Sequence, residues 1–84
     1  MAYIDLEGLK TALGDKGSLI KDYMKLVFLC DSYNKIYYTN YKDIANKLGV
    51  SYVKALNTIK ALRNANVIED INRDYIKVLY IDKR

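Results

Sequence analysis

The chain has 84 residues, of which 51% are hydrophobic and 29% charged, and its formal net charge is +4. Because a polypeptide this short buries only one modest apolar core, we expect a single domain over residues 1–84. The hydrophobic fraction excludes a disordered chain. One cysteine and no histidine exclude an internal disulfide and metal sites of the usual Cys/His kind, so we expect a reducing compartment, no metal and no cofactor.

The sequence lacks the signals of membrane insertion and secretion. Its longest apolar run covers residues 26–30 and is too short to span a membrane. Asp5 and Glu7 near the start do not fit a cationic signal peptide. We therefore expect a cytoplasmic protein.

Positive charge is concentrated in the second half of the chain. Residues 1–34 carry a net charge of −1, whereas residues 35–77 carry +4. A basic half beside a neutral one is typical of a surface that faces phosphates, and ordinary solvated lysines are the alternative explanation.

Two helices are predicted in the first third of the chain. The first covers residues 4–13 and is followed by two glycines. Ser18 is predicted to cap a second helix over residues 18–32. This second helix is apolar over most of its circumference, so it is buried either against its own domain and a second subunit or as the central core helix of a monomer. The apolar stripe of the first helix consists of Ile4, Leu6, Leu9 and Leu13.

A short strand and two closely spaced helices follow. Residues 36–39 are rich in β-forming side chains and predict a strand. Asn40 is predicted to cap a helix that ends at Gly49, where glycine adopts the left-handed conformation without steric cost. Ser51 then caps the next helix, and two helices joined by so short a turn cross at a steep angle. The first of them is expected to bury Ile44, Ala45 and Leu48, with Asp43 near its positive dipole end.

The helix from Tyr52 to about residue 65 has two different sides when mapped at about 100° per residue. Asn66 follows it at a left-handed position, and residues 67–71 and 75–81 predict the two strands of a hairpin. The predicted core side contains Tyr52, Ala55, Leu56, Ile59 and Leu62. The opposite side contains Lys54, Asn57, Lys60, Ala61 and Asn64, with Val53 at the margin.

Residues 40–51 contain an Ile44-Ala45 pair followed by Leu48-Gly49-Val50-Ser51. This segment resembles the helix-turn-helix of winged-helix transcription regulators of bacteria and archaea. The resemblance covers about residues 20–82. It continues through Ala55, Ile59 and Leu62, at the core positions of the family's recognition helix, and through Asn66, Val67 and Ile68, at its exit into the wing.

The resemblance implies an α+β fold, a winged helix-turn-helix with a three-helix core, an N-terminal helix and a C-terminal β-hairpin wing. Residues 1–17 would form an N-terminal extension, and residues 18–82 the winged helix-turn-helix. The implied function is that of a sequence-specific transcription regulator that binds double-stranded DNA and is not an enzyme. Such compact regulators resemble those of archaea and their viruses or plasmids.

In this family the second helix of the pair, here residues 51–65, lies in the major groove. Lys54 and Asn57 are then the first choices for base contacts, because lysine suits guanine and asparagine can pair with adenine through two hydrogen bonds. The alternatives are surface solvation and, for Tyr52, core packing. The predicted DNA-binding residues are Ser51, Tyr52, Val53, Lys54, Asn57 and Lys60 on this helix, Lys42 and Lys47 on the preceding helix, and Arg73 and Lys77 in the wing.

A homodimer through the N-terminal helices is also expected. Paired half-sites about 34 Å apart would increase the affinity of a single small module. Cys30 would either meet its mate in an intermolecular disulfide or be a buried, unreactive thiol. The predicted seam consists of Leu6, Leu9, Leu13 and the outer side of residues 18–32.

Three other functions compete with this interpretation. An enzyme is disfavoured because the sequence has no histidine, no phosphate-cradling glycine loop and no nucleophile–base set. A protein-docking module is the stronger rival, since winged-helix domains also serve as docking pieces and nine tyrosines suit an interface. A nonspecific DNA-binding accessory protein lies between the two.

Overall fold

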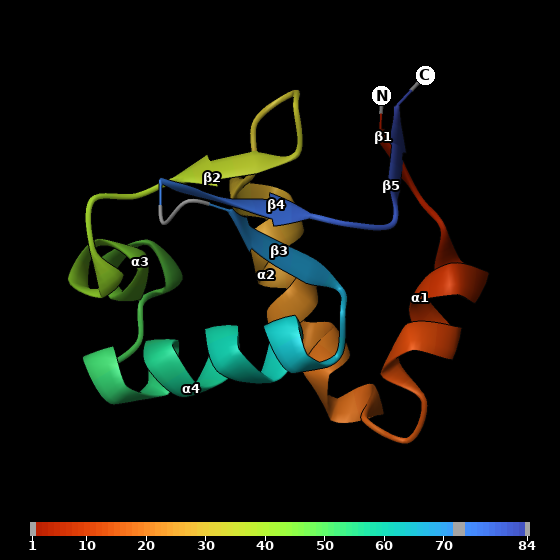
Figure 1. The fold of residues 1–84 in the computed structure, drawn as a ribbon, viewed down its shortest axis with the longest axis horizontal. Helices are drawn as coiled ribbons and strands as arrows, with labels where there is room; N and C mark the ends of the chain where they lie inside the picture. The colour runs from red at the N-terminus through yellow and green to blue at the C-terminus, as the bar shows by residue number, and fades with distance from the viewer. Residues whose placement is uncertain (1, 72–73, 84) are drawn as a thin grey trace.

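The computed structural model describes residues 2–71 and 74–83 and has an α+β fold, in which helices pack against one side of a small antiparallel sheet (Figure 1). Within the described residues, strands β2, β4 and β3 form a three-stranded sheet in that order, and β1 pairs with β5. The elements in chain order are β1 (Ala2–Ile4), α1 (Leu6–Leu13), a 3₁₀ turn (Gly17–Leu19), α2 (Ile20–Leu29), β2 (Lys35–Tyr37), α3 (Tyr41–Leu48), α4 (Tyr52–Asn64), β3 (Ile68–Ile71), β4 (Tyr75–Val78) and β5 (Ile81–Lys83).

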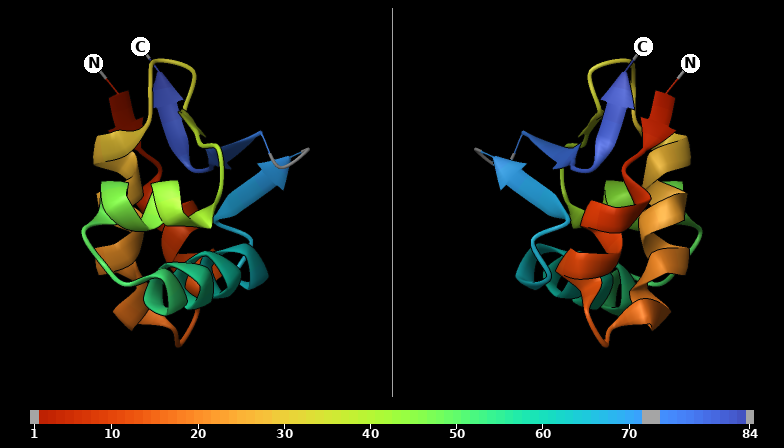
Figure 2. Two further views of the ribbon diagram at one scale, coloured as in Figure 1. Left: turned by 90° about the vertical axis from the view of Figure 1, so that its left-hand side faces the viewer. Right: turned by 90° about the vertical axis from the view of Figure 1, so that its right-hand side faces the viewer.

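The first helix begins later than predicted, because its first residues belong to a strand. The side chain of Asp5 accepts a hydrogen bond from the backbone N–H of Gly8 at 3.1 Å and so caps α1. Ile4, predicted to be helical, instead pairs with Ile81 of β5. The two chain ends therefore lie side by side (Figure 2), a pairing that local periodicity does not reveal.

The prediction for α2 was wrong at both ends. Ser18 lies within the 3₁₀ turn that leads into the helix, and the N-cap position is occupied by Leu19, which makes no side-chain cap. The helix ends at Leu29, because the Asp31 carboxylate accepts hydrogen bonds from the N–H groups of Tyr33 and Lys35 and organises a turn there.

Only one face of α2 is buried. Tyr23 and Leu26 face the core, whereas the Phe28 side chain is 84% exposed. The helix is therefore not covered over most of its circumference within the chain. Cys30 is half-buried, and its thiol donates to the carbonyl oxygen of Val27 at 3.1 Å.

The predicted pair of helices is confirmed together with its caps. The Asn40 side chain accepts from the N–H of Asp43 at 3.0 Å, and Ser51 Oγ accepts from the N–H of Lys54 at 3.2 Å. Gly49 has φ 70° and ψ 34°, the left-handed conformation predicted for it. Three residues separate α3 from α4, so the two helices cross steeply (Figure 1).

The hairpin is shorter than predicted and continues into a separate strand. Asn66 has φ 60°, as expected for the residue after α4, and β3 pairs with β4 from Ile68↔Val78 to Ile71↔Tyr75. The predicted strand over residues 75–81 is divided at Tyr80, whose φ of 62° turns the chain toward β1. The strand predicted over residues 36–39 begins at Lys35 and ends at Tyr37, and it joins the sheet beside β4.

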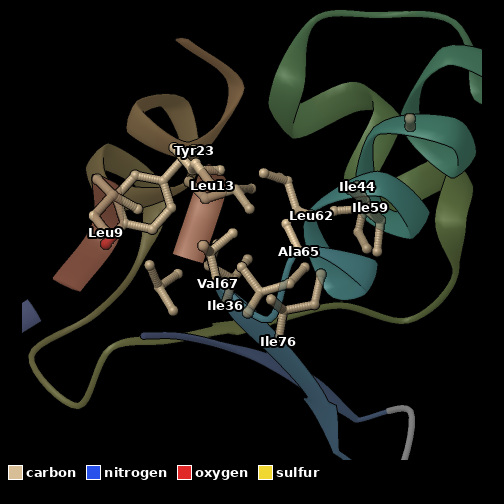
Figure 3. Close-up of a cluster of buried hydrophobic side chains, with 14 of the residues drawn as sticks. Leu9, Leu13, Tyr23, Ile36, Ile44, Ile59, Leu62, Ala65, Val67 and Ile76 are labelled. Atoms are coloured by element: carbon tan, nitrogen blue, oxygen red, sulfur yellow. The ribbon is translucent and has the colours of Figure 1, made fainter. Parts of the chain in front are cut away.

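A single apolar core joins all parts of the described chain (Figure 3). Leu9 and Leu13, which were predicted to lie in a dimer seam, are instead 0% and 4% exposed inside the chain's own core. Because both side chains are buried within the chain, they are not available to form a subunit seam. The core consists of Leu9, Leu13, Tyr23, Leu26, Ile36, Ile44, Ala45, Ala55, Ile59, Leu62, Ala65, Val67, Ile68, Ile76 and Val78.

No helix in residues 2–71 and 74–83 is both long enough and apolar enough to cross a membrane.

Candidate nucleic-acid interface

Helix α4 is anchored on one side and open on the other. Ala55, Ile59 and Leu62 have no exposed surface, and they fix the helix against the core. The opposite side is exposed along its whole length, and close-packed anchoring leaves its side chains on a rigid support. The exposed residues on that side are Val53, Lys54, Asn57, Lys60 and Asn64.

Two residues predicted to lie in the core are on the surface. Tyr52 is 47% exposed and Leu56 is 38% exposed. At about 100° per residue both lie at the edge of the arc centred on the three anchoring residues. The buried arc of α4 is therefore narrower than the apolar stripe of the sequence. The exposed flank of α4 that carries Tyr52 and Arg63 borders a pocket.

The start of α4 combines a cap with an exposed hydroxyl. Ser51 Oγ is occupied as an acceptor by the Lys54 N–H, but a serine hydroxyl can also donate one hydrogen bond. Tyr52 and Val53 are exposed beside it. Six of the predicted DNA-binding residues are exposed on α4 and its cap: Ser51, Tyr52, Val53, Lys54, Asn57 and Lys60. Tyr52 lies apart from Lys54, on the flank of α4 that lines the pocket with Arg63.

The two predicted lysines of α3 differ in their surroundings. Lys42 is exposed near the start of the helix. Lys47 Nζ lies 2.7 Å from Asp43 Oδ2 and donates to the carbonyl oxygen of Tyr37 at 3.2 Å. Hydrogen bonding to Lys47 and to the backbone N–H of Thr39 lowers the pKa of the Asp43 carboxyl. The charge of Lys47 is therefore already balanced within α3.

Of the two predicted DNA-binding residues of the wing, the structure describes only Lys77. Lys77 lies in β4, half-buried, between Lys35 of β2 and Glu69 of β3 in the strand register. The Lys35 ammonium lies 4.6 Å from the centre of the Tyr75 ring. Arg73, predicted to contact DNA from the tip of the wing, lies outside the described residues.

A buried carboxylate beside α4 was not predicted. The Asp70 side chain is only 5% exposed, and it accepts hydrogen bonds from Tyr38 at 2.6 Å, Tyr41 at 3.2 Å and Arg63 at 3.4 Å. Burial, together with the neighbouring Asp70 charge, raises the pKa of both tyrosines, and hydrogen bonding to Asp70 adds to the rise. Their hydroxyls thus stay protonated as donors to the carboxylate.

These residues form one side of a pocket of about 690 Å³ between the start of α3, the flank of α4 and β3. The sequence contained a partial signal for it, since Arg63 and Tyr52 fall on the same flank when α4 is mapped at about 100° per residue. It contained no signal for Asp70, which lies about 30 residues along the chain from Tyr38 and Tyr41.

Nothing in the described part of the chain forms a metal site, because no three histidine, cysteine, aspartate or glutamate side chains there are placed to hold an ion. No protein-family model, no curated protein and no solved structure matches the chain. A function can therefore be proposed only from the geometry of α3, α4 and the strands beside them.

Proposed function

We propose that the chain is a winged helix-turn-helix domain that binds double-stranded DNA sequence-specifically and regulates transcription in the cytoplasm, without enzymatic activity. A single observation carries the proposal: α4 presents a continuous exposed polar side while its opposite side is locked into the core. The major groove admits an α-helix and displays a distinct donor and acceptor pattern for each base pair. In this proposal α3 crosses the DNA backbone and β3 and β4 form the wing.

Lys54 and Asn57 are the proposed base-reading residues. They lie three positions apart, so they are neighbours on the exposed side of the helix. Lysine donates to the O6 and N7 atoms of guanine, and asparagine pairs with the N6 and N7 atoms of adenine. Val53, which is 63% exposed, provides apolar contact for a thymine methyl group.

Other cations would bind phosphates and fix the register of the helix on the duplex. Lys42 and Lys60 are exposed and suit this role better than Lys47, which is paired with Asp43, or Lys77, which is half-buried. Substitution of Lys60 by glutamine should weaken binding to all sequences alike and reduce the salt slope by about one unit.

Selection of bound sites from a random duplex library, followed by fluorescence anisotropy on the selected site, tests the proposal. Asn57→Ala should cost about 1–3 kcal/mol on the selected site and much less on random duplex. Thr11→Ala is the control, because Thr11 is an exposed polar residue of α1, outside the proposed interface of α3, α4 and the wing. Equal losses for the two variants, or no enrichment of any sequence, would contradict base reading by α4.

We also propose that two copies bind paired half-sites as a homodimer. Leu6 of the predicted seam is still exposed, and Phe28 and Leu29 form an exposed apolar edge on α2. Sedimentation at micromolar concentration should show a dimer, and Phe28→Ser should shift it toward the monomer. A monomeric wild-type chain at that concentration contradicts the homodimer but leaves DNA binding by α4 intact.

A protein-docking module is the second candidate. It is favoured by Phe28 in the last turn of α2 and by Tyr33, which is 72% exposed, in the loop between α2 and β2. The end of α2 and this loop lie at the end of the molecule opposite α4 (Figures 1 and 2). Binding to random duplex DNA at low and moderate salt distinguishes the two candidates. Failure to bind random duplex at low salt favours docking, and binding that competitor DNA abolishes favours a nonspecific accessory role.

A further inference from the structure

The pocket beside α4 has the size and the wall chemistry of a ligand site. Its volume of about 690 Å³ lies within the range of roughly 300–1,000 Å³ that is usual for small-molecule sites. Its walls come from the start of α3, the flank of α4 and β3, so the tertiary fold builds it.

Three tyrosines supply aromatic surface to this pocket: Tyr38, Tyr41 and Tyr52. The rings of Tyr38 and Tyr41 lie 6.0 Å apart at an angle of 31°. Both hydroxyls donate to the buried Asp70 carboxylate, which fixes the two rings in place. Aromatic faces held in this way suit a planar ring, because every nucleobase has a face that can stack on them.

The residues that line the pocket include two cations, Lys42 and Arg63, and one carboxylate, Asp70, which forms an ion pair with Arg63. The Asp70 oxygens are buried and already accept three hydrogen bonds. Arg63 is about half exposed and uses one N–H on Asp70, whereas a guanidinium has five donors. Lys42, which also lines the pocket, adds a second exposed cation. The accessible groups therefore suit an anion, and guanidinium forks suit phosphate.

We propose that this pocket binds one nucleotide unit, with the base against the tyrosine rings and the phosphate at Arg63 and Lys42. An inorganic phosphate would leave the aromatic walls unused, and a neutral aromatic molecule would leave the cations unused. The nucleotide can be a free mononucleotide or an extrahelical nucleotide of a bound DNA strand. Binding of an extrahelical nucleotide rests on the proposed function, whereas binding of a free mononucleotide does not.

Titration of the ¹⁵N-labelled full chain with dTMP and dAMP tests the free source. We expect shifts of the backbone resonances of Tyr41, Arg63 and Asp70, and weaker binding of thymidine, which lacks the phosphate. Arg63→Gln and Lys42→Gln should each weaken dTMP binding by about tenfold, the effect of losing one charge-assisted contact. Arg63→Gln also breaks an ion pair and could disturb the fold, whereas Lys42 is exposed, so Lys42→Gln tests the pocket without that risk. Lys10→Gln on α1 removes the same charge away from the pocket and is the control.

A duplex that carries 2-aminopurine in the selected site tests the second source. Fluorescence should rise on binding if a base leaves the stack, and Arg63→Gln should abolish the rise. If no duplex binds at all, the proposed function fails, but dTMP binding that depends on Arg63 still supports the pocket. Equal affinity for dTMP and thymidine overturns the proposal. The proposal is also overturned if millimolar dTMP and dAMP cause no resonance shifts in the pocket and the 2-aminopurine fluorescence of a bound duplex does not change. If no duplex binds, the lack of resonance shifts alone overturns it.

Discussion

The N-terminal region, from β1 to α2, and the pair of helices α3 and α4 share one core but are held by different kinds of contact. The helix pair is set by caps that span three residues or fewer, at Asn40 and Ser51. The N-terminal region depends on partners at the far end of the chain. The Asp5 N–H donates to the Tyr80 carbonyl at 2.8 Å, and the Tyr23 hydroxyl donates to the Leu79 carbonyl.

This difference explains why the bounds of α3 and α4 were predicted more accurately than those of the strands and helices of the N-terminal region. Local contacts can be inferred from spacing alone, whereas a strand such as β1 exists only because β5 reaches it. Substitutions in each region test whether the two form one cooperative unit.

The largest effect is expected at Leu9, which is fully buried although it belongs to the predicted extension. Leu9→Ala should lower the free energy of unfolding by about 2–5 kcal/mol, because it leaves a cavity in the shared core. Ile59→Ala in α4 should have a loss within the same range. Urea denaturation measures both, and a loss below about 0.5 kcal/mol for Leu9→Ala would show that α1 is an independent appendage.

Tyr23→Phe should cost about 1–3 kcal/mol, because the Leu79 carbonyl loses its buried donor. Burial, chiefly, raises the pKa of Tyr23 to about 12 from 10.0. The folded state therefore holds this proton more tightly than the unfolded state, so the associated stability is complete below pH 10 and is lost as the pH rises to about 12. Denaturant melts from pH 8 to 12 should show a shallower alkaline decline in the variant.

The effect of a local cap is expected to be smaller. Ser51→Ala should lower stability by about 0.5–2 kcal/mol, because the Lys54 N–H loses its acceptor at the start of α4. Ser51→Gly should cost only a few tenths of a kcal/mol. Thermal melts of the two variants provide the comparison, and equal losses would indicate that the hydroxyl has another role.

Gly8→Ala distinguishes local helix propensity from tertiary packing. Propensity alone favours alanine in α1 by about 0.8–1.0 kcal/mol. A Cβ at this position would collide with the Asp5 carboxylate that caps α1, and it would lie 2.8 Å from Cδ1 of the Tyr80 ring, closer than such contacts allow. Overpacking costs of about 1–3 kcal/mol should exceed the gain in propensity, so we expect a net loss of about 1 kcal/mol. A stabilised variant in the same melts would show that the Tyr80 ring moves aside freely.

Phe28→Ser should have the smallest effect on the monomer. The side chain is 84% exposed, so its loss should change the unfolding free energy by less than about 0.5 kcal/mol. Leu26→Ala, two positions earlier and buried, should cost about 2–5 kcal/mol. At protein concentrations where the proposed homodimer forms, the loss at Phe28 should be larger and should depend on concentration. A small loss at every concentration would exclude this side chain from a subunit interface.

The candidate interface on α4 could be inferred from the sequence in large part. Lys54, Asn57 and Lys60 were predicted to be exposed, and they are, because a 3.6-residue period separates the two sides of any amphipathic helix. The prediction that Tyr52 and Leu56 lie in the core was wrong. Periodicity gives the direction of each side chain around the helix axis, but not how much of the helix surface the neighbouring elements cover. Only packing against β3 and α3 decides how much is covered.

The features that could be inferred from the amino-acid sequence are local: the Asn40 and Ser51 caps, the left-handed residues Gly49 and Asn66, and the two sides of α4. Each depends on groups only a few residues apart, so backbone stereochemistry and short hydrogen bonds suffice. The β1–β5 pairing, the burial of Leu9 and the pocket around Asp70 become visible only in the folded chain. These features bring together groups far apart in the chain, and their formation depends on the shape of the whole core.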